Sequence, residues 1–339
     1  MATTNIVAKQ RILYLDLTKA FAIFCVLLGH VIQLSSSNDP YHDSWLFQFI
    51  YAYHMPLFVM VSGFFLGKSL QQPFKVFLQK RITQLILPII TFGSLFFVFH
   101  NTIYTALSGH APITFNTCFF GANMWFLRYL FAMLGIAYIS KRLFRNTLIA
   151  ALLPMVILFC FTKSGIFRLY PYLWCGYFFA THSEKLLQHC KRNFAISTLI
   201  FAAGLCFWQG DYDANLRFIF LKPHFYLDTE HLGYVLIRLW VGLSGSFTFL
   251  FLFKLLSDQL PQNKLSTYVQ RVGRHTLGIY CVQIYLLEFA LDHFKVQFSQ
   301  YDNTVFHIAF AMLLLIVFNT IVVGLEKNKW TALCFLGKK

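Results

Sequence analysis

Seven ionisable side chains lie inside otherwise apolar stretches of this sequence. They are Asp16, Lys19, His30, His54, Arg128, Arg238 and Glu288. An ionisable side chain within the hydrocarbon of a bilayer is costly, and such residues usually face a polar interior where they move protons or bind charged ligands. All seven are therefore candidates for a functional site, provided that the stretches around them cross a membrane.

Lys19 and His30 have the most informative spacing. Eleven residues of α-helix turn through about 1100°, roughly 20° beyond three full turns, and advance by about 16 Å. The two side chains therefore share one helix face. An imidazole can take a proton from a hydroxyl near neutral pH or carry an acyl group, and a cation can hold an anionic substrate. Their alignment predicts a polar pathway between the two sides of the membrane.

These candidates also have structural interpretations. His54 stands two residues before Pro56, so its ring could bond a backbone group that the proline frees. Lys19 could extend its amine to the cytoplasmic surface. Arg128 and Glu288 could form an ion pair that only stabilises the fold. The residues alone leave these alternatives open.

The composition indicates why ionisable residues are rare here. Of 339 residues, 58% are hydrophobic and 12% are charged, whereas a typical soluble domain carries about 25% charged residues. Many of the apolar runs approach the roughly 20 residues that cross a bilayer, and backbone groups in lipid must be paired, which favours helices. We therefore predict an all-α, polytopic membrane bundle of about ten transmembrane helices with no soluble domain. The runs are 12–34, 45–67, 82–104, 122–140, 146–162, 166–182, 194–210, 232–256, 276–294 and 304–325.

Basic residues predict the orientation of these helices. The net charge of +15 could suggest nucleic-acid binding, but 20 Lys and Arg residues fall on one set of alternating loops and 5 on the other. This asymmetry follows the positive-inside rule. It predicts an even number of crossings of the cytoplasmic (inner) membrane, both ends in the cytoplasm and no nucleic-acid partner. Residues 11–325 are expected to form the membrane domain, and residues 326–339 a short basic cytoplasmic tail.

Four motifs in order resemble acyltransferase family 3, whose membrane proteins include O-acetyltransferases of bacterial surface sugars. They are Arg11 to Lys19 continuing to Leu28-Gly29-His30, Tyr53-His54-Met55-Pro56 continuing to Ser62-Gly63-Phe64-Phe65, Met124-Trp125-Phe126-Leu127, and Gly273-Arg274-His275-Thr276-Leu277-Gly278-Ile279-Tyr280. The resemblance implies transfer of an acyl group, usually acetyl from acetyl-CoA, to a sugar hydroxyl.

The family pattern also implies roles for individual residues. In its first span a basic residue is followed by ten residues and an essential histidine, which Lys19 and His30 match with Lys in place of the commoner Arg. The family's Arg-x-x-Arg pair after the second span is incomplete, because Gln84 occupies the second position after Arg81. Lys80 could supply the missing cation.

The candidate residues can be grouped by expected role. The expected catalytic residues are His30, His54 and Glu288. The expected acyl-CoA-binding residues are Lys19, Lys80 and Arg81. The expected acceptor-binding residues are Asp16, Arg128 and Arg238. Acyl-CoA is a substrate in this scheme, so no bound cofactor is expected, and no His and Cys spacing typical of a metal site occurs.

The working hypothesis is that acyl-CoA enters from the cytoplasm, reaches toward His30 and acylates a carbohydrate hydroxyl, or that of its lipid-linked precursor, near the outer face. A multispanning transporter or flippase of such a carbohydrate is the main alternative, because intramembrane His, Arg and Glu residues also form proton relays. A non-catalytic membrane scaffold would have no need of buried charges at Lys19, His30 and Arg128.

Overall fold

A computed structural model describes residues 12–36, 44–108, 111–120, 124–161, 166–208, 229–261 and 263–338. Within its helices, the side chains of residues 107, 108, 120, 159–161, 167, 229–231 and 288–293 lie outside the description. Every regular element in these ranges is helical. The predicted all-α class is therefore confirmed for the described part of the chain.

The helices follow one another with short connections. Their bounds are α1 Leu13–Ser35, α2 Trp45–Phe64, α3 Leu66–Leu70, α4 Phe74–Arg81, α5 Leu87–Phe99, α6 Thr105–Ser108, α7 Phe115–Phe120, α8 Trp125–Leu143, α9 Thr147–Phe161, α10 Ile166–Thr181, α11 Ser183–Gln188, α12 Cys190–Leu205, α13 Thr229–Gln259, α14 Lys264–Phe298, α15 Thr304–Glu326 and α16 Lys329–Leu336. A single 3₁₀ turn, Ser299–Tyr301, precedes α15.

Each of the ten predicted apolar runs overlaps a helix. Five described helices are long and apolar enough to cross a membrane: α1, α2, the continuous stretch Phe74–Tyr104, Leu232–Gln259 within α13, and α15. The others are shorter or carry more charge. Helices α10 and α12 have 16 residues each, and α8 contains Arg128, Lys141 and Arg142. The protein is therefore a helical membrane protein, while the count of ten crossings stays a prediction.

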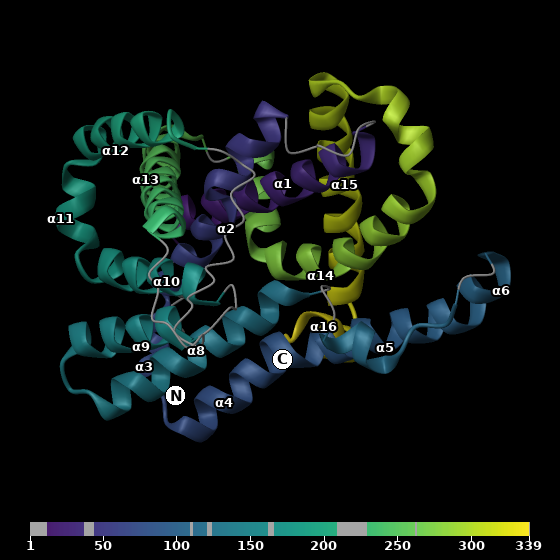
Figure 1. Ribbon diagram of the computed structural model, residues 1–339, viewed down its shortest axis with the longest axis horizontal. Coiled ribbons are helices and arrows are strands. Elements are labelled where there is room, and N and C mark those ends of the chain that lie inside the picture. The colour runs from purple at the N-terminus through teal and green to yellow at the C-terminus, as the bar shows by residue number, and fades with distance from the viewer. Residues whose placement is uncertain are drawn as a thin grey trace, which may run out of the picture.

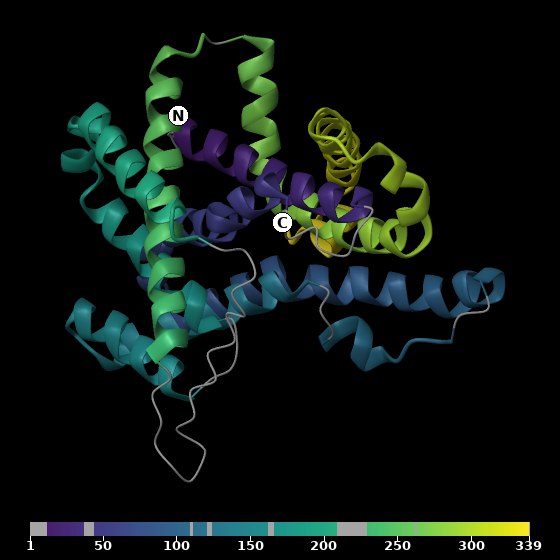
Figure 2. The same cartoon turned by 45° about the horizontal axis from the view of Figure 1, so that its top comes forward.

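The stretch Phe74–Tyr104 is one long rod that includes two π-helical turns, Ile82–Ile86 and His100–Tyr104. The first π turn ends just before Pro88, whose missing N–H and bulky ring disturb the regular hydrogen-bond pattern. In Figures 1 and 2 this rod extends along one side of the molecule, with α16 packed against α5. The turn also carries Gln84, next to Arg81, into the interior discussed below.

Helix α1 forms the centre of the bundle. Most of its residues are buried, and it packs mainly against α14, with further contacts to α2, α13 and α15. Figure 1 shows α1 between α2 and α13 on one side and α14 and α15 on the other. The candidate residues of α1 therefore face protein on several sides.

Glycines permit the closest helix contacts. A Cβ at Gly273 of α14 would lie 2.0 Å from the backbone oxygen of Asp16 on α1. Gly63 of α2 and Gly176 of α10 approach each other's helices equally closely, since a Cβ at either would lie 1.9 Å from a carbonyl oxygen of the other helix. Small residues at such crossings are typical of membrane helix packing. The Gly273 contact brings Arg274 and His275 beside the first turns of α1.

Candidate active site

A basic cavity of about 810 Å³ opens at the beginning of α1. Its charged and titratable lining residues are Asp16, Lys19, Lys68, Arg271, Arg274, His275, Glu326 and Lys338. Five of these are Lys or Arg and two are carboxylates, so the lining carries a positive balance. Such a cavity can hold a polyanion, because Arg and Lys bind phosphate through charge and hydrogen bonds.

The structure places Lys19 and Asp16 together in this cavity. The Nζ atom of Lys19 lies 2.6 Å from Oδ1 of Asp16, one turn earlier on α1. Asp16 is thus an ionic partner of a cavity cation, at the end of α1 that the sequence predicts to be cytoplasmic. It is not among the residues that line the outer cavity described below, and its expected acceptor-binding role stays a prediction.

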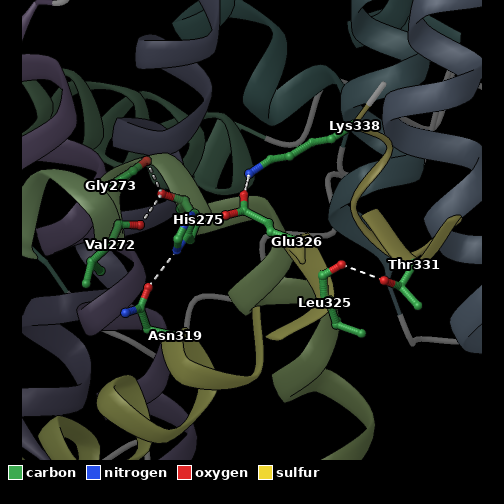
Figure 3. Close-up of polar contacts among 9 residues, drawn as sticks. Val272, Gly273, His275, Asn319, Leu325, Glu326, Thr331 and Lys338 are labelled. Atoms are coloured by element: carbon green, nitrogen blue, oxygen red, sulfur yellow. Dashed lines mark hydrogen bonds and ion pairs between the residues drawn. The ribbon is translucent and has the colours of Figure 1, made fainter. Parts of the chain in front are cut away.

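His275 links α14 to α15 beside the same cavity (Figure 3). Its Nδ1 lies 2.8 Å from Oδ1 of Asn319, and its Nε2 lies 3.0 Å from Oε2 of Glu326. Lys338 donates to the other oxygen of Glu326. Burial lowers the pKa of His275, and the Asn319 contact and the Glu326 carboxylate oppose that shift. The network fixes the chain's last residues against the cavity wall.

An inner cavity of about 380 Å³ continues from the basic cavity. The two share Lys19, Phe65, Arg274 and Lys338. The deeper lining is mostly apolar and includes Val26, Met55, Phe126 and Tyr280. Since Val26 lies two turns beyond Lys19 on α1 and four residues before His30, the combined hollow follows the face of α1 that the spacing of Lys19 and His30 predicted.

Arg81 lines the inner cavity. It donates to Oε1 of Gln84 at 3.2 Å and to the hydroxyl of Ser69, and it lies over the ring of Phe77 at 5.6 Å. Gln84 occupies the position where the family pattern has a second arginine. Its side-chain oxygen accepts a hydrogen bond and so orients Arg81, whereas an arginine at this position would repel Arg81. Lys80 is exposed on α4 and is not among the residues that line either cavity.

An outer cavity of about 300 Å³ contains His54, Arg168 and Arg238, with aromatic walls that include Trp125 and Tyr172. It meets the inner cavity at Met55, which lines both. The hydroxyl of Tyr172 donates to the backbone oxygen of Arg238 at 3.1 Å. The outer cavity thus combines an imidazole, two cations and flat apolar surfaces.

The ring of His54 has a defined tautomer. Its Nδ1 lies 2.8 Å from the backbone oxygen of Ile50, and a carbonyl oxygen can only accept a hydrogen bond. Nδ1 therefore carries the proton when the ring is neutral, which leaves the Nε2 lone pair as a potential base. The ring also packs edge-on against Tyr51, with centroids 4.7 Å apart.

His30 stands between these hollows along α1. Its Nδ1 lies 3.0 Å from Oε1 of Gln33, and its side chain is partly exposed. Gly29, the preceding residue, contacts Tyr51 of the outer cavity, while Val26 lines the inner one. His30 and His54 are close enough to interact electrostatically. The structure therefore brings the two predicted catalytic histidines into one region.

Two further candidates lie elsewhere or outside the description. Arg128 donates to the backbone oxygen of Phe119 at 2.9 Å and is not among the lining residues of the outer cavity, although Trp125 and Tyr129 on either side of it are. Glu288 is on α14, but its side chain lies outside the described residues. The suggested Arg128–Glu288 ion pair therefore stays a prediction.

Several cations that line the cavities were predicted from the sequence only as basic loop residues, without a functional role. Arg271, Arg274 and Lys338 were predicted as cytoplasmic, yet no role followed because their partners are distant in sequence. Arg168, near the start of the predicted run 166–182, was counted with the basic residues of the outer side and given no role. It lies on α10 and lines the outer cavity. No group of three or more His, Cys, Asp or Glu side chains with metal-binding geometry occurs among the residues that the structure describes.

The structure combines apolar helices long enough to cross a membrane with a basic cavity at the start of α1 and two histidines, His30 and His54, in one region. The chain belongs to acyltransferase family 3, because the sequence model of that family's acyltransferase domain matches residues 12–324. The matched model describes an acyltransferase domain.

Two curated relatives are both called nodulation protein NolL. The one from Sinorhizobium fredii is 28% identical over 222 residues, which cover 60% of this chain and 59% of the relative. The one from Mesorhizobium japonicum is 31% identical over 98 residues, covering 28% of this chain and 26% of the relative. The matched region thus spans about three fifths of the first relative's length. No solved structure matches.

Proposed function

We propose that the protein is a membrane O-acyltransferase that moves an acyl group, most simply acetyl, from cytoplasmic acyl-CoA to a carbohydrate hydroxyl at the outer face. The observation that carries this proposal is the pair of adjacent cavities along α1, which share four lining residues. The first lies among cations at Lys19, and the second reaches Val26 and Met55, beside the region of His30 and His54.

The basic and inner cavities match the two ends of an acyl-CoA. The phosphates of CoA are polyanionic, and the basic cavity offers Lys19, Arg271, Arg274 and Lys338. The rest of the donor is a long flexible arm that ends in a thioester, and the lining of the inner cavity is mostly apolar. Donor binding in this direction would deliver the thioester to the deep end of the inner cavity.

The reaction needs a base and a way to neutralise the leaving thiolate. An imidazole Nε2 takes the acceptor hydroxyl proton as its oxygen attacks the thioester carbonyl. The C–O bond forms, the C–S bond breaks, and the imidazolium returns the proton to the CoA thiolate. His30 is our assignment for this base. His54, whose tautomer is fixed, positions the acceptor or supports the imidazole of His30. Acyl transfer through His30 itself would balance equally, with the acyl group carried briefly on nitrogen.

The topology proposal is ten crossings of the inner membrane with both ends in the cytoplasm. Ile12 near the start and Lys338 near the end line the same basic cavity, which is consistent with an even number of crossings. The distribution of Lys and Arg over the loops gives the direction. This arrangement puts the basic cavity where acyl-CoA is made.

The direct test uses membranes or proteoliposomes containing the full chain, supplied with radiolabelled acetyl-CoA. The wild type is expected to transfer label to a surface glycan, with a mass increase of one acetyl group. His30→Ala should reduce transfer about 10²–10⁴-fold, the usual contribution of a general base, at an unchanged membrane level. His182→Ala, at an exposed histidine after α10, is the control and should retain activity.

Retained transfer in the His30→Ala variant would remove the proposed mechanism. Absence of label transfer by the wild type, together with movement of an unmodified carbohydrate across the proteoliposome membrane, would instead support a transporter. The two outcomes are separated by mass analysis of the carbohydrate, since transport leaves its mass unchanged.

A further inference from the structure

Two of the sequence motifs meet at the inner cavity and have no role in the reaction described so far. Residues 124–127 begin α8, and residues 273–280 lie on α14. The rings of Phe126 and Tyr280, one from each motif, pack edge to face with centroids 5.7 Å apart, and both residues line the inner cavity. Trp125, the preceding residue of α8, lines the outer cavity. The start of α8 therefore contributes to both cavities.

The hydroxyl of Tyr280 is buried beside the start of α8. Tyr280 is 7% exposed, and no residue in the part of the chain that the structure describes accepts the proton of its hydroxyl. The backbone N–H of Phe126 lies near the hydroxyl oxygen but, as a donor, cannot accept that proton. A buried polar group without a partner costs free energy. An acceptor for the Tyr280 proton is therefore expected from a ligand in the inner cavity.

The start of α8 provides a positive potential at this hydroxyl. The first N–H groups of a helix have no partner within it and form the positive end of the helix dipole. No described side chain caps α8, and Met124, which precedes it, is buried with a φ of 52°, a conformation that is uncommon for residues other than glycine. Arg128, further along α8, is near enough to Tyr280 to add positive charge. Negative charge that develops on a ligand oxygen here is therefore stabilised.

We propose that the hydroxyl of Tyr280, at the positive end of α8, donates a hydrogen bond to the carbonyl oxygen of the acyl thioester and stabilises the oxyanion that forms during transfer. The inference deepens the proposed function, on which it rests, by assigning an oxyanion donor to the inner cavity.

The proposed step requires no proton transfer from Tyr280. As the acceptor oxygen attacks the thioester carbon, the C=O π electrons move onto the carbonyl oxygen, and the phenol keeps its proton while its hydrogen bond to that oxygen strengthens. The C=O bond then re-forms, the C–S bond breaks, and the CoA thiolate takes the proton from the imidazolium of His30. Tyr280 thus acts on the transition state more than on the bound donor.

Removing this hydroxyl should slow the chemical step without weakening donor binding. In proteoliposomes containing the full chain, Tyr280→Phe should lower kcat for acetyl transfer about 10²–10³-fold, the usual loss for one oxyanion donor, while the KM for acetyl-CoA stays close to the wild-type value. The matched control is Tyr170→Phe, because Tyr170 is also a buried tyrosine but lines none of the three cavities. This control should keep the wild-type kcat.

Thermal unfolding without acyl-CoA checks the fold of the variant. Because a buried hydroxyl without an acceptor is destabilising, Tyr280→Phe should unfold at the same temperature as the wild type or at a higher one. A loss of kcat in a variant of undiminished stability is the result expected of a group that acts on the substrate rather than on the fold.

The hydrogen bond can also be observed without acyl transfer. Acetyl-CoA that is isotope-labelled at the carbonyl carbon gives an infrared C=O band, whose frequency falls when the oxygen accepts a hydrogen bond. With no acceptor present, this band should lie lower on the wild type and on Tyr170→Phe than in solution, and Tyr280→Phe should lose most of that shift. A full shift in Tyr280→Phe, or wild-type kcat in that variant, would overturn the assignment.

The proposed reaction and the assignment of Tyr280 can fail separately. Transfer of acetyl to a glycan at equal rates by the wild type and by Tyr280→Phe would remove the assignment and leave the acyltransferase reaction intact. A Tyr280-dependent shift of bound acetyl-CoA, without acyl transfer to any saccharide, would keep the donor contact and remove the proposed reaction. Failure of the wild type to bind acetyl-CoA would remove both.

Discussion

At the scale of single residues, His54 shows how a bond to the backbone can fix the tautomer of a candidate catalytic residue. The sequence allowed its ring to bond a backbone group released by Pro56, which would be the carbonyl of Ala52, four residues earlier. The structure instead gives Nδ1 a bond to the carbonyl of Ile50. The bond therefore fixes the ring, independently of the proline, and directs the other nitrogen's lone pair away from the helix backbone.

We expect His54→Asn to separate the structural role of His54 from its chemical role. The Asn amide can still donate toward the carbonyl of Ile50 but offers no basic nitrogen. Its thermal unfolding should therefore stay within a few degrees of the wild type, while kcat for acyl transfer falls about 10²-fold. His54→Ala should lose activity and also some stability, because it leaves a void beside Tyr51. Wild-type kcat in His54→Asn would show that the ring only supports the fold.

Also at the residue scale, the side-chain contacts of Arg81 could not be predicted from the spacing of residues in the sequence. The pair of Lys19 and His30 was predictable because helical periodicity relates residues of one helix. The role of Gln84 was not, because it depends on a side-chain bond to Arg81 across a π turn. Lys80 was the expected substitute cation, yet it projects from the exposed side of α4.

At the scale of helices, the sequence predicted where helices occur better than which helices pack against each other. All ten apolar runs overlap helices, since run length and composition are local properties. The contact between α1 and α14 is not local: it depends on Gly273 meeting the backbone of Asp16, two positions that are far apart in the sequence. The place of Arg271 and Arg274 in the basic cavity therefore depends on the packing of α14 against α1, which the sequence does not show.

Gly273→Ala should disturb this contact. The new Cβ would lie 2.0 Å from a backbone oxygen, so α1 and α14 must separate, at a cost of about 1–3 kcal/mol. We expect a lower unfolding temperature and weaker acyl-CoA binding, measured by thermal shift with and without the donor. Gly135→Ala is the matched control, because a Cβ there meets nothing within 4 Å and Ala favours helix. Equal stability of the two variants would contradict the packing argument.

At the scale of the whole molecule, the two ends of the described chain converge on the basic cavity. Ile12 contributes to its lining from the start of α1, and Lys338 from beyond α16. Residues 326–339 were expected to form a short basic tail, and their described part includes α16 and the Lys338–Glu326 contact. Gly337, with φ +60°, makes the turn that returns the chain toward Thr83.

The position of Lys338 predicts a specific effect on donor affinity. It lines both the basic and the inner cavity, 12 residues beyond its partner Glu326. Lys338→Ala removes one of five cations around the proposed phosphates, so the KM for acyl-CoA should rise about threefold to tenfold, corresponding to about 0.7–1.4 kcal/mol, with a smaller change in kcat. Lys329→Ala, at an exposed residue that begins α16, should leave both constants unchanged. Because screening weakens exposed charges, the difference between the variants should shrink as salt is raised. A salt-independent loss of kcat in Lys338→Ala would instead indicate that the end of the chain supports the fold of the cavity rather than the charge of its ligand.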